Sequence, residues 1–177
     1  MKTLNKIVRL VTLPGVLIKA FWERIFANLT GIEVKRASVA GHISHGEADF
    51  VQLVAYCMFS GLPVLITGLP LLIFGFGILG PLGALPARGS AALIFAVAVA
   101  ALYLGLSLLS NIYPSIEDAK MLWAFASVTE SKLGKIVGYP FAAVMLIGAH
   151  CETWGLCALM WFGGAAAYFL NYVFGAV

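Results

Sequence analysis

Ionisable side chains are scarce in this sequence, whose 177 residues include 11 Lys or Arg, 8 Asp or Glu and 3 His. Lys19 and Glu23 stand four positions apart, so on a helix they would share a face and form an ion pair. Asn111 and Asp118 lie in a second polar segment, N-I-Y-P-S-I-E-D. A charge in an apolar interior needs a partner. We therefore take these four residues as a candidate buried polar cluster.

Asp118 has two open interpretations. Ser115 can serve as the N-cap of a helix that runs to about residue 129, with Asp118 at the third helical position, where a carboxylate favours the helix dipole. Asp118 also falls on the apolar side of that helix, among Met121, Leu122, Phe125 and Val128. A carboxylate buried there would need Lys19 or a bound cation as its partner.

Two histidines could take part in metal chemistry. His42 and His45 are three positions apart, and imidazole suits zinc, iron or copper. Glycines flank the pair, which is typical of a solvated surface loop, and this is the interpretation we favour. The alternative is a zinc site in which His42 and His45 join Asp118, with Glu23 as a further ligand. The sequence favours no metal, no other cofactor and no catalytic residue.

The composition indicates the class of protein in which these residues lie. Hydrophobic residues make up 62% of the chain and charged residues 11%, and the mean hydropathy is +0.98, whereas soluble domains carry about 25% charged residues. We predict an all-α integral membrane protein in contact with the lipid bilayer. The net charge of +3 is too small and too scattered to indicate a nucleic-acid partner. The three cysteines have no C-x-x-C spacing and are expected to be small buried apolar residues.

Long uncharged runs predict the membrane-spanning segments, because about 20 apolar residues cross the hydrocarbon core. We expect about four transmembrane segments, at residues 50–87, 89–111, 133–151 and 153–177. The polar triplet His150, Cys151 and Glu152 would form the tip of a tight hairpin between the last two. Residues 1–49 would comprise an interfacial helix at 14–30 and a cytoplasmic loop, and residues 112–132 a cytoplasmic helix.

The placement of Lys and Arg predicts the orientation in the membrane. In the four-segment arrangement, ten of the 11 cations lie on one side and Arg88 lies on the other. Both termini would then be cytoplasmic, in the cell's inner (plasma) membrane. A crossing by residues 14–30 would divide the cations almost evenly and remove this bias. Two short crossings meeting near Gly68 and Pro70, or a broken helix that lines a cavity, are alternatives for residues 50–87.

The order of these motifs resembles that of membrane metalloproteases of the site-2-protease type, including bacterial zincin peptidases. Leu13-Pro14-Gly15 leads into Lys19-Ala20-Phe21-Trp22-Glu23, where that family places a helix with H-E-x-x-H. Asn111, Pro114, Ser115 and Asp118 are similar to a later element whose aspartate completes the metal site. The resemblance covers roughly residues 10 to 125. It implies a membrane-embedded scaffold with both elements at the cytoplasmic face.

The sequence departs from the family pattern at the residues that hold zinc. Lys19, Ala20 and Glu23 stand where the motif needs His, Glu and His, so a positive charge occupies the cation position and the general base is missing. We expect an ion pair between Lys19 and Asp118 in place of the metal. The sequence thus predicts a non-catalytic pseudoenzyme, an accessory or structural subunit that contacts other membrane proteins. An active metal-dependent intramembrane protease and a small transporter or channel are the alternatives.

Overall fold

The computed structural model describes residues 2–36, 44–46, 48–82, 90–128, 130 and 132–174. This part of the chain forms seven helices and one two-stranded antiparallel hairpin. The elements in order are α1 (Lys2–Val11), α2 (Leu13–Leu29), β1 (Val34–Arg36), β2 (Ser44–His45), α3 (Phe50–Leu82), α4 (Ser90–Leu109), α5 (Ile116–Val128), α6 (Lys132–Thr153) and α7 (Leu156–Phe174). The prediction of an all-α protein is confirmed at this level.

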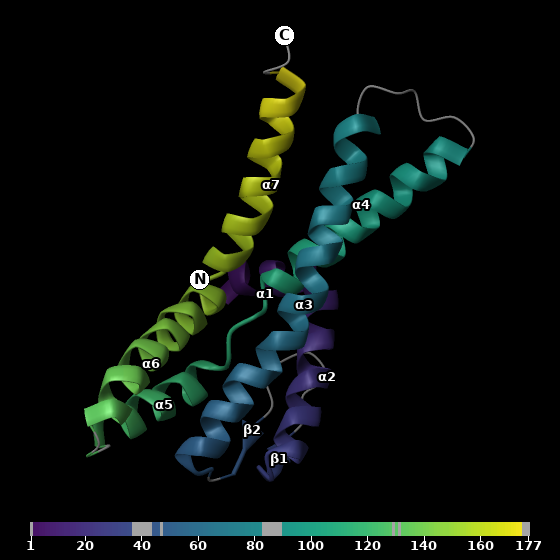
Figure 1. Cartoon of the computed structure of the whole chain (residues 1–177). Coiled ribbons are helices and arrows are strands. Elements are labelled where there is room, and N and C mark those ends of the chain that lie inside the picture. The colour runs from purple at the N-terminus through teal and green to yellow at the C-terminus, as the bar shows by residue number, and fades with distance from the viewer. Residues whose placement is uncertain are drawn as a thin grey trace.

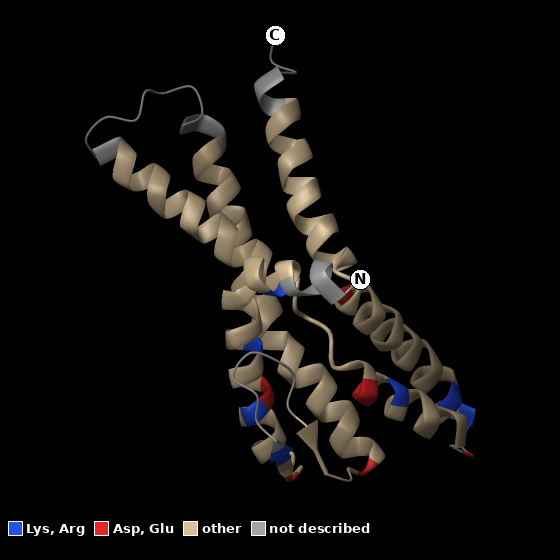
Figure 2. Ribbon diagram, turned by 180° about the vertical axis from the view of Figure 1, so that it is seen from behind, with Lys and Arg blue, Asp and Glu red and all other residues tan. Residues whose placement is uncertain are grey.

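The molecule has two halves, and α3 runs through both (Figure 1). The charged half contains α2, the hairpin, the first part of α3, α5 and α6. The uncharged half contains the second part of α3, α4 and α7, and residues 60–82, 90–109 and 156–174 include no Asp, Glu, Lys or Arg. Figure 2 shows that the charged residues, coloured blue and red on the ribbon, gather in the first half and at the centre of the molecule. Charged side chains are costly where a helix contacts lipid, so this division is consistent with a membrane protein whose uncharged half lies in the bilayer.

Within the described residues, three helices are long and apolar enough to cross a membrane. They are Phe50–Leu79 in α3, Ala92–Leu109 in α4 and Gly134–Thr153 in α6, and α7 adds a shorter apolar helix, Leu156–Asn171. Large apolar side chains such as Ile73, Leu93 and Met160 are exposed on these helices. This is the pattern of a multi-pass membrane protein, whose outer surface faces hydrocarbon instead of water.

Glycines bring α3 and α4 into close contact. A methyl group on Gly75 would lie 2.7 Å from Leu102 Cβ, and one on Gly105 would lie 2.7 Å from the Leu72 nitrogen. Small residues of this kind let helix backbones approach within a membrane. The Gly- and Pro-rich run is one continuous helix over Phe50–Leu82, so the alternatives of two short crossings or a broken helix are wrong for these residues.

The predicted hairpin between the last two apolar segments is also wrong. Figures 1 and 2 show α6 and α7 continuing in the same general direction, with a bend between them at the centre of the molecule. Gly155 has a φ of +75° at this bend, a conformation that glycine adopts without strain. The end of α7 therefore lies at the end of the molecule away from the charged half, whereas the prediction placed both termini on the side of the cations.

Helix α2, which covers the helix predicted at 14–30, lies along α3 and α4. Its buried face carries Gly15, Lys19, Ala20, Glu23 and Ala27, and it packs against both of the longer helices. At Gly15 the backbone approaches that of Ser107 so closely that no side chain would fit. Lys19 and Glu23 thus point into the protein, whereas Asn28 on the same helix is exposed.

Candidate functional site

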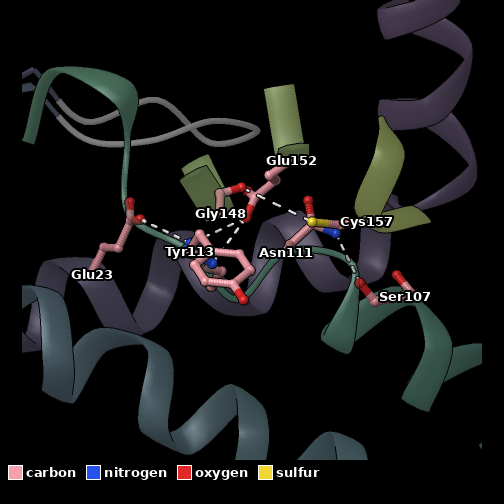
Figure 3. A network of polar contacts seen from close by, with 8 residues as sticks. Glu23, Ser107, Asn111, Tyr113, Gly148, Glu152 and Cys157 are labelled. Carbon is pink, nitrogen blue, oxygen red and sulfur yellow. Dashed lines mark hydrogen bonds and ion pairs between the residues drawn. The ribbon is translucent and has the colours of Figure 1, made fainter. Parts of the chain in front are cut away.

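Lys19 lies at the centre of a buried charge network in the middle of the molecule. Its side chain is 3% exposed, and its Nζ lies 3.9 Å from Glu23 Oε1 and 3.8 Å from Glu152 Oε2. Figure 3 shows Glu23 and Glu152 on opposite sides of this network. Since removing charges from water costs several kcal/mol per ion, neighbouring charges of opposite sign are needed to offset that cost.

Glu152 is the member of the network that the sequence interpretation missed. It stands in the last turn of α6, and its Oε2 also accepts a hydrogen bond of 2.9 Å from the backbone N–H of Tyr113. Gly148, one turn earlier, lets the Tyr113 ring pack directly against the α6 backbone. The prediction of a polar hairpin tip at this residue is wrong, because Glu152 faces Lys19 and Tyr113. A signal was present, because Glu152 is the single carboxylate in the sequence after Glu130.

Asn111 and Ser107 connect the end of α4 to the start of α2. The Asn111 side-chain amide donates a hydrogen bond of 2.8 Å to the Ser107 carbonyl, and the backbone N–H of Gly15 donates one of 2.8 Å to Ser107 Oγ. Thr12, the N-cap of α2, makes no capping hydrogen bond with its own side chain. Ser107, on another helix, therefore satisfies one of the N–H groups that every helix leaves free at its start.

Asp118 pairs with His45, so the predicted ion pair between Lys19 and Asp118 is wrong. His45 Nε2 lies 2.7 Å from Asp118 Oδ1, and the two side chains are 2% and 4% exposed. The backbone N–H of Asp118 donates to Ser115 Oγ at 3.1 Å. Ser115 thus caps α5 as predicted, and Asp118 combines a place in the first turn with a buried contact. Lys19 instead pairs with Glu152 at the end of α6.

The hairpin places His45 beside α5 and α3. Gly31, with a φ of +75°, ends α2 and reverses the chain, and the Gly46 N–H donates a hydrogen bond of 2.8 Å to the Glu33 carbonyl. The ring of His45 contacts the ring of Tyr56 on α3 edge to face, with centroids 5.5 Å apart. Both strands are short, so these side-chain contacts fix the hairpin against the helices.

Both ring nitrogens of His45 face oxygen acceptors. Nδ1 lies 2.9 Å from the Gly46 carbonyl, and Nε2 faces the Asp118 carboxylate. An imidazolium satisfies both with its two N–H groups. The hydrogen bond with Asp118 raises the pKa of His45 above its usual 6.5, the Gly46 carbonyl and the charge of Glu23 act in the same direction, and burial opposes them. His45 therefore favours its charged form in the folded protein.

The structure keeps the candidate residues in two groups. Lys19, Glu23, Asn111 and Asp118 are all buried, but Lys19 pairs with Glu23 and Glu152, whereas Asp118 pairs with His45. His42 lies outside the described residues. Within the described ranges, no three His, Cys, Asp or Glu side chains lie close enough together to hold a metal ion.

The Lys19 ammonium lies 3.9 and 3.8 Å from two carboxylates, and His45 pairs with Asp118, so the arrangement can hold charges of opposite sign inside the protein. Comparison of the chain with protein-family models, with curated proteins and with solved structures gives no match.

Proposed function

We propose that the chain is a non-catalytic multi-pass membrane protein on a metalloprotease-like scaffold, serving as an accessory or structural subunit of a membrane complex. The observation that carries this proposal is the position of Lys19, whose ammonium lies between Glu23 and Glu152. It occupies the face of α2 on which the peptidases that the sequence resembles hold their metal. A fixed positive charge there opposes the binding of a cation.

Ala20 supports the same proposal. In the resembling peptidases the residue at this position is the general base that activates the metal-bound water. Ala20 has no ionisable group and is 4% exposed in the packed face of α2. A side chain that cannot move a proton leaves this scaffold without the step on which metal hydrolysis depends.

Open small-residue positions on α7 support a role as a subunit. A methyl group added to Gly163 or Gly164 would meet no described atom within 4 Å. In a membrane, such positions favour close contact with a helix of another protein. The charged half would face the cytoplasm, because Lys and Arg are retained on that side of a membrane, and α3, α4 and the α6–α7 pair would cross the plasma membrane.

Co-purification in mild detergent tests the subunit role. We expect the wild-type protein to elute with another membrane protein at a fixed stoichiometry, measured by quantitative mass spectrometry. Gly163→Leu with Gly164→Leu should lose that protein while keeping the helical circular dichroism spectrum. Leu170→Met, an exposed change on the same helix, should retain it. A wild-type protein that purifies alone and monomeric would overturn the subunit role.

A metal-dependent hydrolase is the second candidate, and one observation favours it. Asp118 Oδ2 is buried and has no hydrogen-bond partner among the described residues, so an acceptor oxygen remains beside His45. His45 and Asp118 could supply two ligands to zinc, with His42 as a third. Elemental analysis after gentle extraction decides between the candidates. Stoichiometric zinc that is lost in Asp118→Asn, together with peptide hydrolysis, would establish the hydrolase and refute the non-catalytic proposal.

A further inference from the structure

A small polar cavity adjoins Lys19. It has a volume of about 40 Å³ and lies between α1, α2, the end of α4 and the end of α6. Its polar lining includes Thr12, Lys19, Glu23, Ser110, Asn111 and Glu152. Ligand pockets for organic molecules measure about 300 Å³ or more, whereas one water needs about 10–15 Å³ of such space. The size therefore admits a few water molecules and excludes a larger ligand.

The Lys19 ammonium needs acceptors that the described protein atoms do not supply. Its Nζ is buried without a hydrogen-bond partner among them. The distances of 3.9 and 3.8 Å to Glu23 and Glu152 are ion-pair distances, longer than the roughly 3.2 Å limit of a hydrogen bond. An ammonium carries three N–H donors. Since Lys19 also lines the cavity, acceptors placed there can complete its hydrogen bonds.

The hydroxyl oxygens of Thr12 and Ser110, which line the cavity, can accept hydrogen bonds. Thr12 donates its hydroxyl proton to the Val8 carbonyl at 2.9 Å, and Ser110 donates its own to the Leu106 carbonyl at 2.7 Å. Their oxygens keep lone pairs for another donor. A site that needs both an acceptor for Lys19 and donors for these oxygens matches water, which is both.

The cavity has a route to the surface. Arg9 and Thr153 also line it, and both of these residues are exposed, whereas Thr12, Lys19 and Glu23 are buried. The polar lining thus continues from an exposed rim to a buried end.

From these observations we infer that the cavity is a water-filled vestibule that opens beside Arg9 and Thr153 and ends at Lys19. Water in it joins the ammonium to the surrounding carboxylates and hydroxyl oxygens. A buried water of this kind makes about three hydrogen bonds, and it lowers the cost of keeping charges inside an apolar protein. The inference depends neither on a partner protein nor on the loss of catalysis.

Two alanines on α2 provide a matched test. Ala20 lines the cavity and Ala27 does not. They are seven positions apart on the same buried face, at 4% and 0% exposure. In full-length protein whose Cys57, Cys151 and Cys157 are replaced by Ala, the variants Ala20→Cys and Ala27→Cys each carry one thiol. X-ray radiolysis generates hydroxyl radicals from water in place, and mass spectrometry measures the oxidation of each thiol.

We expect the thiol of Ala20→Cys to be oxidised at least about tenfold faster than that of Ala27→Cys, because ordered water lies next to position 20 only. Equal, slow oxidation in the two variants would overturn the vestibule. Circular dichroism and size-exclusion chromatography show whether each variant folds. If Ala20→Cys does not fold, Thr12→Cys replaces it, since Thr12 lines the cavity and is 1% exposed. The same tenfold criterion then decides the question.

Discussion

The charged half and the uncharged half are held together in different ways. In the charged half, an apolar cluster that includes Ala27, Leu53, Leu122 and Ala126 joins α2, α3, α5 and α6, and the Lys19 and Asp118 contacts lie beside it. In the uncharged half, a cluster of Leu79, Ala98, Leu102, Leu106 and Ala165 joins α3, α4 and α7. Here glycines set the spacing of the helices.

The difference follows from what surrounds each half. Helices in lipid gain little from burying apolar surface, because lipid tails are as apolar as leucine, so close packing must stabilise them. A buried charge in such a protein costs free energy unless an opposite charge lies close to it, so each buried charge needs a specific partner. We therefore expect the charged half to be sensitive to charge removal and pH, and the uncharged half to be sensitive to side-chain volume.

The largest effect is expected for Lys19→Met. The substitution removes the cation shared by Glu23, which is 1% exposed, and Glu152, which is 11% exposed. Breaking a buried pair costs about 3–5 kcal/mol. The apparent unfolding temperature in detergent should fall accordingly. Lys120→Met, an exposed change on α5, should stay within about 0.5 kcal/mol of wild type. Equal unfolding temperatures for the two variants would show that the Lys19 network contributes no stability to the charged half.

A smaller loss is expected for Gly75→Ala in the uncharged half. The added methyl group would meet Leu102 Cβ at 2.7 Å, and overpacking of this kind costs about 1–3 kcal/mol. Gly77→Ala is the matched control, because no described atom lies within 4 Å of the added group. It should be neutral or stabilising, since alanine is the better helix former. Thermal unfolding of both variants measures the difference, and similar losses would contradict the glycine contact.

Ser115→Ala should destabilise the protein by about 1 kcal/mol through loss of the α5 N-cap. Ser115 Oγ accepts the hydrogen bond from the Asp118 N–H, so the change also loosens the carboxylate that holds His45. Ser127→Ala removes a hydroxyl from the exposed end of the same helix and serves as the control. Denaturant unfolding compares the two. If Ser127→Ala lowered the free energy of unfolding as much as Ser115→Ala, the capping contribution would be refuted.

The smallest effect concerns pH and is confined to the hairpin. Because the contact with Asp118 raises the pKa of His45 above 6.5, its stabilisation is complete below that pH and is lost as pH rises through the higher folded value. Hydrogen exchange at the Gly46 N–H, corrected for its intrinsic rate, should become several-fold faster over that range. Asp118→Asn should remove this pH dependence. Exchange that is independent of pH in the wild-type protein would contradict the charged pair.

Much of the fold could be predicted because its causes are local in the sequence. Helices occupy the four long uncharged runs, since a backbone in lipid must satisfy its own hydrogen bonds. Ser115 was recognised as an N-cap because capping depends on residues three positions apart. The direction of α7 relative to α6 was not predictable in this way. A turn at Trp154 and Gly155 permits either a hairpin or a bend, and packing against α3 and α4 selects the bend.

Composition and scarcity of charge are properties of the chain alone, so they indicate a helical membrane protein and single out Lys19, Glu23 and Asp118 without any coordinates. The partners of these residues depend on how the helices pack. Glu152 and His45 come from segments distant in sequence from Lys19 and Asp118. Charge pairing depends on distance in space, and α6 and the hairpin bring these groups within reach only after the helices have packed.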